Sequence, residues 1–294
     1  MRSASIRALC IACPAFVGAC ATTAPSTPAE ESSPFSFVAF GELSNRRTQF
    51  FDEDHDASFA LLDARLEYWL PPGKDSLSWG PYVRFASIAS SSDEAFENFY
   101  GALPGAGLQV YPFSATGGIL GPMRLFAEYD NVRFEGDENA WRPDEQVRGG
   151  LEYWRANGVN DPLVSNWYEL WLGSIWQSSN EFDDAYDTLV NALSLRIGHR
   201  FSEGGLGAQL TPYALVEAIK TDNERYYWEN RAIAGGGLRW APPDDWLVDL
   251  GLERFAVFVE YLEIVDYLED EAPTSVPEDD WRIGLSFSFG EWFK

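Results

Sequence analysis

The chain has few residues that bind metals or act as nucleophiles. Its 294 residues include three cysteines and two histidines, and Cys10 and Cys13 lie within the first twenty positions. Structural zinc sites draw four ligands mainly from Cys and His. We therefore expect no metal site and no cofactor. If the segment that holds Cys10 and Cys13 is removed, at most Cys20 remains, so we expect no disulfide.

Long hydrophobic runs and positive charge are also scarce. No stretch reaches the ~18 to 20 consecutive apolar residues of a membrane-spanning helix, so any membrane span must use strands of ~9 to 11 residues. The chain has 21 Lys and Arg against 46 Asp and Glu, for a net charge of −25. This balance repels a phosphate backbone and argues against nucleic acid or anionic lipid as a partner. With 46% hydrophobic and 15% aromatic residues, the chain is too apolar to be disordered.

The first twenty residues have the pattern of an export signal. Arg2 and Arg7 precede an apolar run, and residues 17–20 fit a lipobox in which Cys20 becomes lipidated. The small residues on either side of Cys20 also suit ordinary signal peptidase, and either route exports the chain. We interpret 1–20 as a signal peptide, 21–34 as a flexible Pro/Thr/Ser tether and 35–294 as a barrel domain in the outer membrane of a Gram-negative bacterium.

Period-two alternation dominates the remainder. In residues 58–70, Leu62 and Leu66 share one face while Arg65 and Glu67 share the other. The pattern predicts an all-β fold, a transmembrane antiparallel up-and-down β-barrel of about twelve strands. The predicted strands are 35–43, 58–70, 80–90, 106–113, 123–134, 146–155, 167–177, 188–200, 206–220, 226–240, 246–262 and 281–289.

The last predicted strand alternates strictly. Between Arg282 and Phe289 it reads polar-x-Gly-x-x-aromatic-x-aromatic, with Gly284 and Phe287 at the intermediate positions. This resembles the assembly signal of bacterial outer-membrane barrels. The resemblance implies the barrel-assembly machinery and outer-membrane lipid as partners.

The predicted connections differ in length. The odd-numbered ones are about 14, 15, 12, 9, 7 and 18 residues and the even-numbered ones about 9, 8, 9, 5 and 6, which predicts periplasmic N- and C-termini and long outer loops. The long set carries acidic runs such as Phe51–Asp56 and Glu181–Asp184. We interpret these runs as a solvated rim, or as sites where divalent cations bridge to polysaccharide or lipid phosphate.

Charged residues on the opposite face of the strands are expected to line the lumen. Positive and negative groups are interspersed, which argues against a strongly ion-selective pore. They could form a conduit for hydrated sugars or cross-link into a plug, since about twelve strands lie between filled and open barrels. We expect an individual pair of arginine and carboxylate in the lumen to be a structural salt bridge rather than part of a binding site. The lumen-lining candidates are Arg65, Glu67, Arg84, Arg124, Glu128, Arg148, Glu152, Arg196, Glu229, Arg231, Arg239 and Glu253.

Aromatic residues and histidines complete the pattern. Trp154, Trp246 and Trp281 are among the aromatics expected in girdles at the lipid headgroups. His55 lies in an acidic run and His199 at the end of a strand on the side predicted to be periplasmic. Neither position suits hydrolysis of outer-leaflet lipid, so we expect no catalytic residues and no enzyme.

Four short sequence segments resemble those of a known protein family. Residues 149–154, 210–213, 235–242 and 252–255 resemble the C-terminal barrel domain of bacteriophage adsorption protein A (NfrA-type) proteins. The resemblance implies a barrel in exopolysaccharide export or surface display that serves phages as a receptor. That family carries a long helical-repeat region before the barrel. Here a periplasmic helical-repeat or synthase partner would be a separate subunit, with polysaccharide as the substrate. A structural or receptor barrel with a plugged lumen and acidic recognition loops is the alternative, and a lipid-modifying enzyme is the third reading.

Overall fold

The structure, a computed structural model, describes most of the predicted barrel domain. The predicted signal peptide, Cys20 and the tether up to residue 33 lie outside the described residues, as do Glu229 and Glu253. The described residues are 34–50, 53–70, 77–92, 99–114, 118–136, 143–159, 164–179, 186–202, 204–222, 230–242, 246–247, 252, 254–268 and 279–289.

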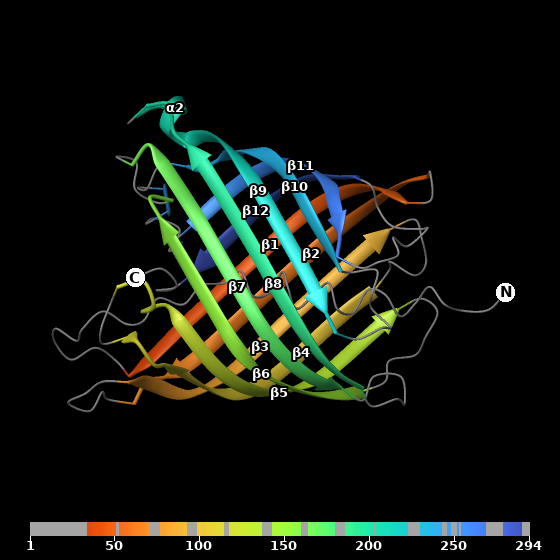
Figure 1. Cartoon of the computed structure of the whole chain (residues 1–294), viewed down its shortest axis with the longest axis vertical. Coiled ribbons are helices and arrows are strands. Elements are labelled where there is room, and N and C mark those ends of the chain that lie inside the picture. Colours follow the sequence, from red (N-terminus) through yellow and green to blue (C-terminus); the bar gives the residue numbers. More distant parts are fainter. Residues whose placement is uncertain are drawn as a thin grey trace.

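Twelve antiparallel strands close into a single barrel (Figure 1). Each strand pairs with its neighbours in sequence, and β12 closes the sheet against β1 from Ala39 opposite Phe289 to Thr48 opposite Asp280. The predicted fold class and strand number are confirmed. The strands are β1 (Phe35–Phe50), β2 (Glu53–Tyr68), β3 (Ser78–Ser92), β4 (Phe99–Tyr111), β5 (Met123–Gly136), β6 (Pro143–Asn157), β7 (Asn166–Ser179), β8 (Tyr186–His199), β9 (Leu210–Thr221), β10 (Arg231–Trp240), β11 (Arg254–Tyr267) and β12 (Asp279–Phe289).

Side chains alternate between a polar interior and an apolar exterior. On β3, Tyr82 and Arg84 are 3% and 4% exposed, whereas the intervening Val83 is 55% exposed. A soluble protein would bury the valine. A closed sheet with an apolar outer face satisfies every backbone hydrogen bond within the bilayer, and bacterial outer-membrane proteins have this design. The chain is an outer-membrane β-barrel.

The barrel has two different rims. We call the end where β1 begins and β12 ends the terminal rim, and the opposite end, where β1 joins β2, the hairpin rim. The short helix α2 (Leu206–Gln209) lies at the terminal rim, at the upper left of Figure 1. No helix among the described residues is long and apolar enough to cross a membrane.

The expected loop asymmetry is wrong. Only residues 51–52 separate β1 from β2 at the hairpin rim, whereas 241–253 separate β10 from β11 at the terminal rim. The hairpin strands continue past the apolar belt because ladder hydrogen bonds persist in polar sequence, which apolar alternation does not reveal. The acidic residues Glu53–Asp56 accordingly lie in β2 rather than in a loop.

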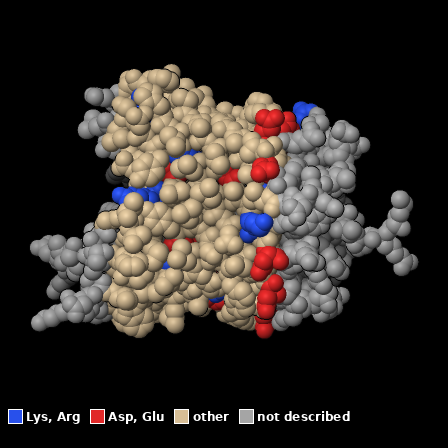
Figure 2. All heavy atoms as spheres, in the orientation of Figure 1, with Lys and Arg blue, Asp and Glu red and all other residues tan. Residues whose placement is uncertain are grey.

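Exposed carboxylates gather at the hairpin rim. Among the described residues, every exposed Asp and Glu side chain lies there, and Figure 2 shows acidic atoms along that edge of the described surface. The rest of the visible outer wall is mostly uncharged. These residues are Asp56, Glu145, Asp187, Asp222, Glu263 and Asp266.

Several strands start away from the predicted positions, and two of them show the reason. β4 begins at Phe99, seven residues earlier than expected, and contains Pro104. Proline has no N–H, and the ladder between β4 and β5 skips Leu103 and Pro104. β9 begins later than expected because Leu206–Gln209 form α2.

The predicted assembly residues lie on both faces of β12. Arg282 is buried inside and Gly284 lies opposite Ser44 of β1. On the outer face, the ring of Phe287 covers Gly41 of β1, where any Cβ would collide with it. Phe287 and Phe289 also meet edge to face at 5.6 Å. The seam that closes the barrel therefore depends on a glycine.

We expect Gly41→Ala to weaken this seam by about 1 to 3 kcal/mol, the usual cost of overpacking. Urea unfolding of the lipid-reconstituted barrel measures the loss. Adding Phe287→Ala should recover part of it, because the truncated side chain vacates the space. Gly204→Ala is the control, since nothing lies within 4 Å of where its Cβ would be. Equal losses in Gly41→Ala and Gly204→Ala would contradict the prediction.

Candidate functional site

Charged side chains fill one side of the lumen. Arg84 of β3 donates to Asp63 of β2 at 3.0 Å and to Glu128 of β5 at 3.1 Å. Arg148 of β6 pairs with Glu128 and, at 3.3 Å, with Asp130. All five side chains are buried. We call Asp63, Arg84, Glu128, Asp130 and Arg148 the packed network.

Further candidates extend the packed network toward the terminal rim. Arg124 pairs with Glu152 at 2.5 Å and donates through Nε to Gln109 at 2.8 Å. Arg65 lies 3.4 Å from Asp63, and Glu67 accepts a hydrogen bond from Ser36. The wall from β2 to β6 is therefore cross-linked by charge-assisted bonds that few solvent molecules reach.

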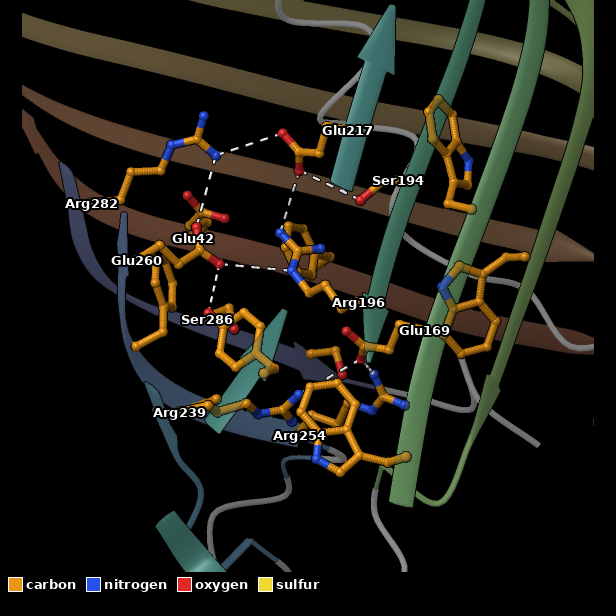
Figure 3. Close-up of a pocket in the computed structure, with 18 of the residues that line it drawn as sticks. Glu42, Glu169, Ser194, Arg196, Glu217, Arg239, Arg254, Glu260, Arg282 and Ser286 are labelled. Atoms are coloured by element: carbon orange, nitrogen blue, oxygen red, sulfur yellow. Dashed lines mark hydrogen bonds and ion pairs between the residues drawn. The ribbon is translucent and has the colours of Figure 1, made fainter. Parts of the chain in front are cut away.

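The opposite side of the lumen holds a looser set of charges (Figure 3). Arg196 of β8 lies 3.6 Å from Glu217 and 3.7 Å from Glu260. Arg282 of β12 lies 3.8 Å from each of the same two carboxylates. We call these four residues the ion-pair ring. Each guanidinium contacts both carboxylates at distances longer than those in the packed network, and Arg282 also donates to Asp280 at 2.6 Å.

A second charged group lies closer to the terminal rim. Glu169 of β7 accepts a hydrogen bond from Arg254 at 2.7 Å and lies 3.7 Å from Arg239. Arg239 and Arg254 also lie over the rings of Trp167 and Trp154, at 5.4 and 5.6 Å from the ring centroids. Such stacking stabilises a guanidinium on an indole face.

A cavity of about 120 Å³ is bordered by the ion-pair ring and the Glu169 group. This exceeds the ~10 to 15 Å³ that a cavity needs to hold one water, so it has room for several water molecules. Four arginines and four glutamates contribute to its lining, together with tryptophan, tyrosine, phenylalanine and serine. The ten labelled side chains of Figure 3 surround this space. Its charges balance, which fits the expectation of no strong ion selectivity.

Three tryptophans belong to this interior. Trp154, Trp167 and Trp171 are 6%, 2% and 3% exposed and line the cavity. The girdle position expected for Trp154 is therefore wrong, because Trp154 occupies an inward position of β6. Trp246 and Trp281 are exposed instead. Trp167 can lie against the wall because it covers Gly198, and Trp171 covers Gly173 in the same way.

The same row of residue types, Tyr, Gly, Glu and Arg on four successive strands, occurs once on each side of the lumen. Tyr82, Gly107, Glu128 and Arg148 lie opposite one another on β3 to β6. The tyrosine hydroxyl donates to the glutamate at 2.6 Å, across the glycine strand.

The second copy of the row is made by Tyr213, Gly237, Glu260 and Arg282 on β9 to β12. Its hydroxyl-to-glutamate distance is also 2.6 Å. Sequence reasoning missed this repeat, although the phrases Pro-Tyr, Gly-x-Gly-Leu and Phe-x-Glu-Tyr recur in the same order in both halves.

The remaining predicted residues lie elsewhere. Arg231 is the first residue of β10, at the hairpin rim, and is not a lining residue of the cavity. His199 is exposed at the terminal rim with Nδ1 2.8 Å from Asn166 Oδ1. His55 lies in β2 opposite Thr48. Among the described residues, no group of three His, Cys, Asp or Glu side chains could hold a metal ion.

We expect Asp63→Asn to destabilise the barrel by about 3 to 5 kcal/mol, because it leaves Arg84 buried without its main carboxylate. Glu169→Gln should cost only about 1 to 2 kcal/mol, since water in the cavity can solvate Arg254. Urea unfolding in lipid vesicles, followed by tryptophan fluorescence, compares the two variants. Similar losses would show that both sides of the lumen are equally dry.

Comparisons with known proteins concern the barrel architecture. No family model and no curated protein sequence matches this chain. Solved structures that align with it include the β domain of the Bordetella autotransporter BrkA, at 12% identity and a TM-score of 0.44, over 86% of this chain and 100% of that one. An outer membrane channel from Pseudomonas putida F1 aligns at 10% identity and a TM-score of 0.44, over 90% and 98%. The translocator domain of the autotransporter NalP from Neisseria meningitidis aligns at 10% identity and a TM-score of 0.41, over 87% and 89%. Likenesses this distant carry no argument about function.

Proposed function

We propose that this outer-membrane barrel is a gated conduit for carbohydrate and that it serves the export or surface display of exopolysaccharide. The substrate class comes from the chemistry of the lumen together with the resemblance to bacteriophage adsorption protein A. Both chain termini face the periplasm in this proposal, and the hairpin rim faces outward. A separate periplasmic helical-repeat or synthase subunit delivers the polysaccharide.

The difference between the two sides of the lumen supports a conduit. The packed network fixes the wall from β2 to β6, whereas the wall from β7 through β12 to β1 borders a cavity with room for water. A hydrated, uncharged chain needs a path that offers both donors and acceptors without a net charge. The cavity lining provides guanidinium and carboxylate groups in equal number.

The contacts that close the lumen in this proposal are ones that can exchange. Each arginine of the ion-pair ring already contacts two carboxylates, so losing one contact leaves the charge partnered. An exchange of partners beside a hydrated cavity avoids the desolvation cost that fixes the packed network. We assign the gate to the ion-pair ring.

A receptor or structural barrel is the second candidate, and the exposed carboxylates of the hairpin rim favour it. In that case the lumen stays plugged and a phage or another surface partner recognises the acidic rim. Neither function requires catalysis. We propose no enzymatic role for His55 or His199.

Planar-bilayer recording tests the conduit. The wild-type barrel should be mostly closed, because the gate assigned to the ion-pair ring is shut while its contacts are made. Replacing Arg196 and Arg282 together by Gln should produce openings that favour cations, since Glu217 and Glu260 then face the path unpaired. Blockade of these openings by neutral oligosaccharides would support passage of sugar.

Arg65→Gln in β2 is the matched control, because it removes a guanidinium from the opposite wall and should open nothing. Silence of the double variant, in barrels shown to be folded by heat-modifiable gel migration, would reject the gate and favour the receptor function. Steady conductance of the wild type would contradict the closed lumen.

A further inference from the structure

We propose that turns of the terminal rim form an anchor that inserts into the headgroup layer of a glycerophospholipid leaflet. The partner is a lipid surface, and it is bound by connections between strands rather than by the strands that cross the membrane. The anchor does not depend on the conduit. Only the identification of this leaflet as the periplasmic one rests on the orientation in the proposed function.

Large apolar side chains stand at the tips of three connections at the terminal rim. Phe201 and Leu206, between β8 and β9, are 71% and 67% exposed. Ile119 and Leu120, between β4 and β5, are 68% and 47% exposed, and Trp246, between β10 and β11, is 56% exposed. We call these five residues the turn tips. Large apolar groups exposed at one end of a protein indicate a surface that contacts a membrane or another protein.

The connection between β8 and β9 lies against the outer wall of the barrel. The ring of Phe201 meets the ring of His199 edge to face at 5.1 Å. His199 shares the outer face of β8 with Ile197, which is 53% exposed. Further along the same connection, Gln209 of α2 accepts a hydrogen bond at 3.3 Å from Nε1 of Trp240, on the outer face of β10. Phe201 and α2 therefore continue the lipid-facing wall past the ends of the strands.

The connection between β4 and β5 does the same. The carbonyl oxygen of Ile119 accepts a hydrogen bond at 2.9 Å from the hydroxyl of Tyr153. Tyr153 is on the outer face of β6, opposite Leu172 of β7, which is 37% exposed. The wall that these turns extend already faces lipid, so lipid is the surface that covers them without a break.

Polar groups beside the turn tips suit the headgroup layer in particular. Tyr and Trp concentrate at this level because their rings are apolar and their hydroxyl or N–H is polar. Arg155 lies on the same outer face as Tyr153 and donates hydrogen bonds to Tyr153 and Tyr168, so a phosphate at this level would meet a guanidinium. Every exposed carboxylate of the described residues is at the hairpin rim, so none of these repels a phosphate here. An apolar protein surface would not use this guanidinium.

Spin labelling measures how deep the turn tips lie. Cys10→Ser, Cys13→Ser and Cys20→Ser remove the native thiols, and Phe201→Cys or Ile119→Cys then takes one nitroxide in barrels refolded into phosphatidylcholine vesicles. The readout is the ratio of collisions with oxygen to collisions with a water-soluble nickel chelate. We expect this ratio to be about threefold or more above that of a label in water, because interfacial side chains lie ~5 to 10 Å into the headgroup and acyl boundary.

Asp187→Cys is the matched control. Asp187 is exposed at the opposite end of β8, at the hairpin rim, so a label there should have the low ratio of a label in water. Leu206→Cys provides a second position on the same connection if Phe201→Cys does not fold. Ratios at 119 and 201 that do not exceed the ratio at 187 would overturn the anchor and leave the turn tips to a protein partner. Equal depth in vesicles of digalactosyldiacylglycerol, which has no phosphate, would overturn the assignment to a glycerophospholipid.

The outcomes separate the anchor from the conduit. Water-accessible turn tips reject the anchor and leave the conduit standing, because conductance is measured independently of depth. Deep turn tips in a barrel whose bilayers stay silent in every variant keep the anchor and reject the conduit.

Discussion

Two glycine-bearing strands determine how this lumen is filled. Gly107 of β4 and Gly237 of β10 stand between a tyrosine on one neighbouring strand and a glutamate on the other. A Cβ at either glycine would lie within 2.8 Å of the tyrosine hydroxyl. Without side chains there, each tyrosine crosses its glycine strand and donates to the glutamate at 2.6 Å. Both carboxylates are thereby held in the lumen, where arginines from the flanking strands reach them.

The two copies of this Tyr–Gly–Glu arrangement have different surroundings, because the neighbouring inward-facing row of residues differs between them. On the first side, Arg84, Gly105 and Asp130 lie opposite one another on β3 to β5, and the two charged side chains approach to 3.5 Å. On the second side, Leu215, Gly235 and Leu262 occupy the corresponding places on β9 to β11, and the leucines pack in an apolar cluster. The charged residues of this row on the first side, Arg84 and Asp130, belong to the packed network. The leucines on the second side add no charged partner, so the arginines that reach Glu260 are those of the ion-pair ring beside the cavity.

The sequence predicts the barrel well because alternation is a local property. The strand number follows from residues such as Leu62 and Arg65, whose order reveals the faces of β2. Which inward residues meet is a matter of register and shear, and these depend on pairing across the whole sheet. Trp154 is an example of what the sequence does not predict. Its place near a strand end predicts a position in an aromatic girdle, but its side chain lies on the inward face of β6. The run Gly235–Gly237 indicates eased curvature or a close approach of neighbouring groups, and the structure shows that Gly237 is where Tyr213 crosses the strand.

In the proposed conduit, passage through the lumen requires movement on one side only. Breaking an ion pair of the packed network would leave a buried charge without a partner. Such a charge costs several kcal/mol, about 3 to 5, because neither water nor another group compensates it. The ion-pair ring differs because Arg196 and Arg282 each contact both Glu217 and Glu260 and because a cavity with room for water borders it. Its contacts of 3.6 to 3.8 Å are long for charge-assisted hydrogen bonds, so little directional bonding is lost when they exchange, while Arg282 keeps its bond to Asp280 at 2.6 Å. A repeated frame in which one copy is packed and the other borders a cavity therefore gives the proposed conduit a fixed wall and a movable one.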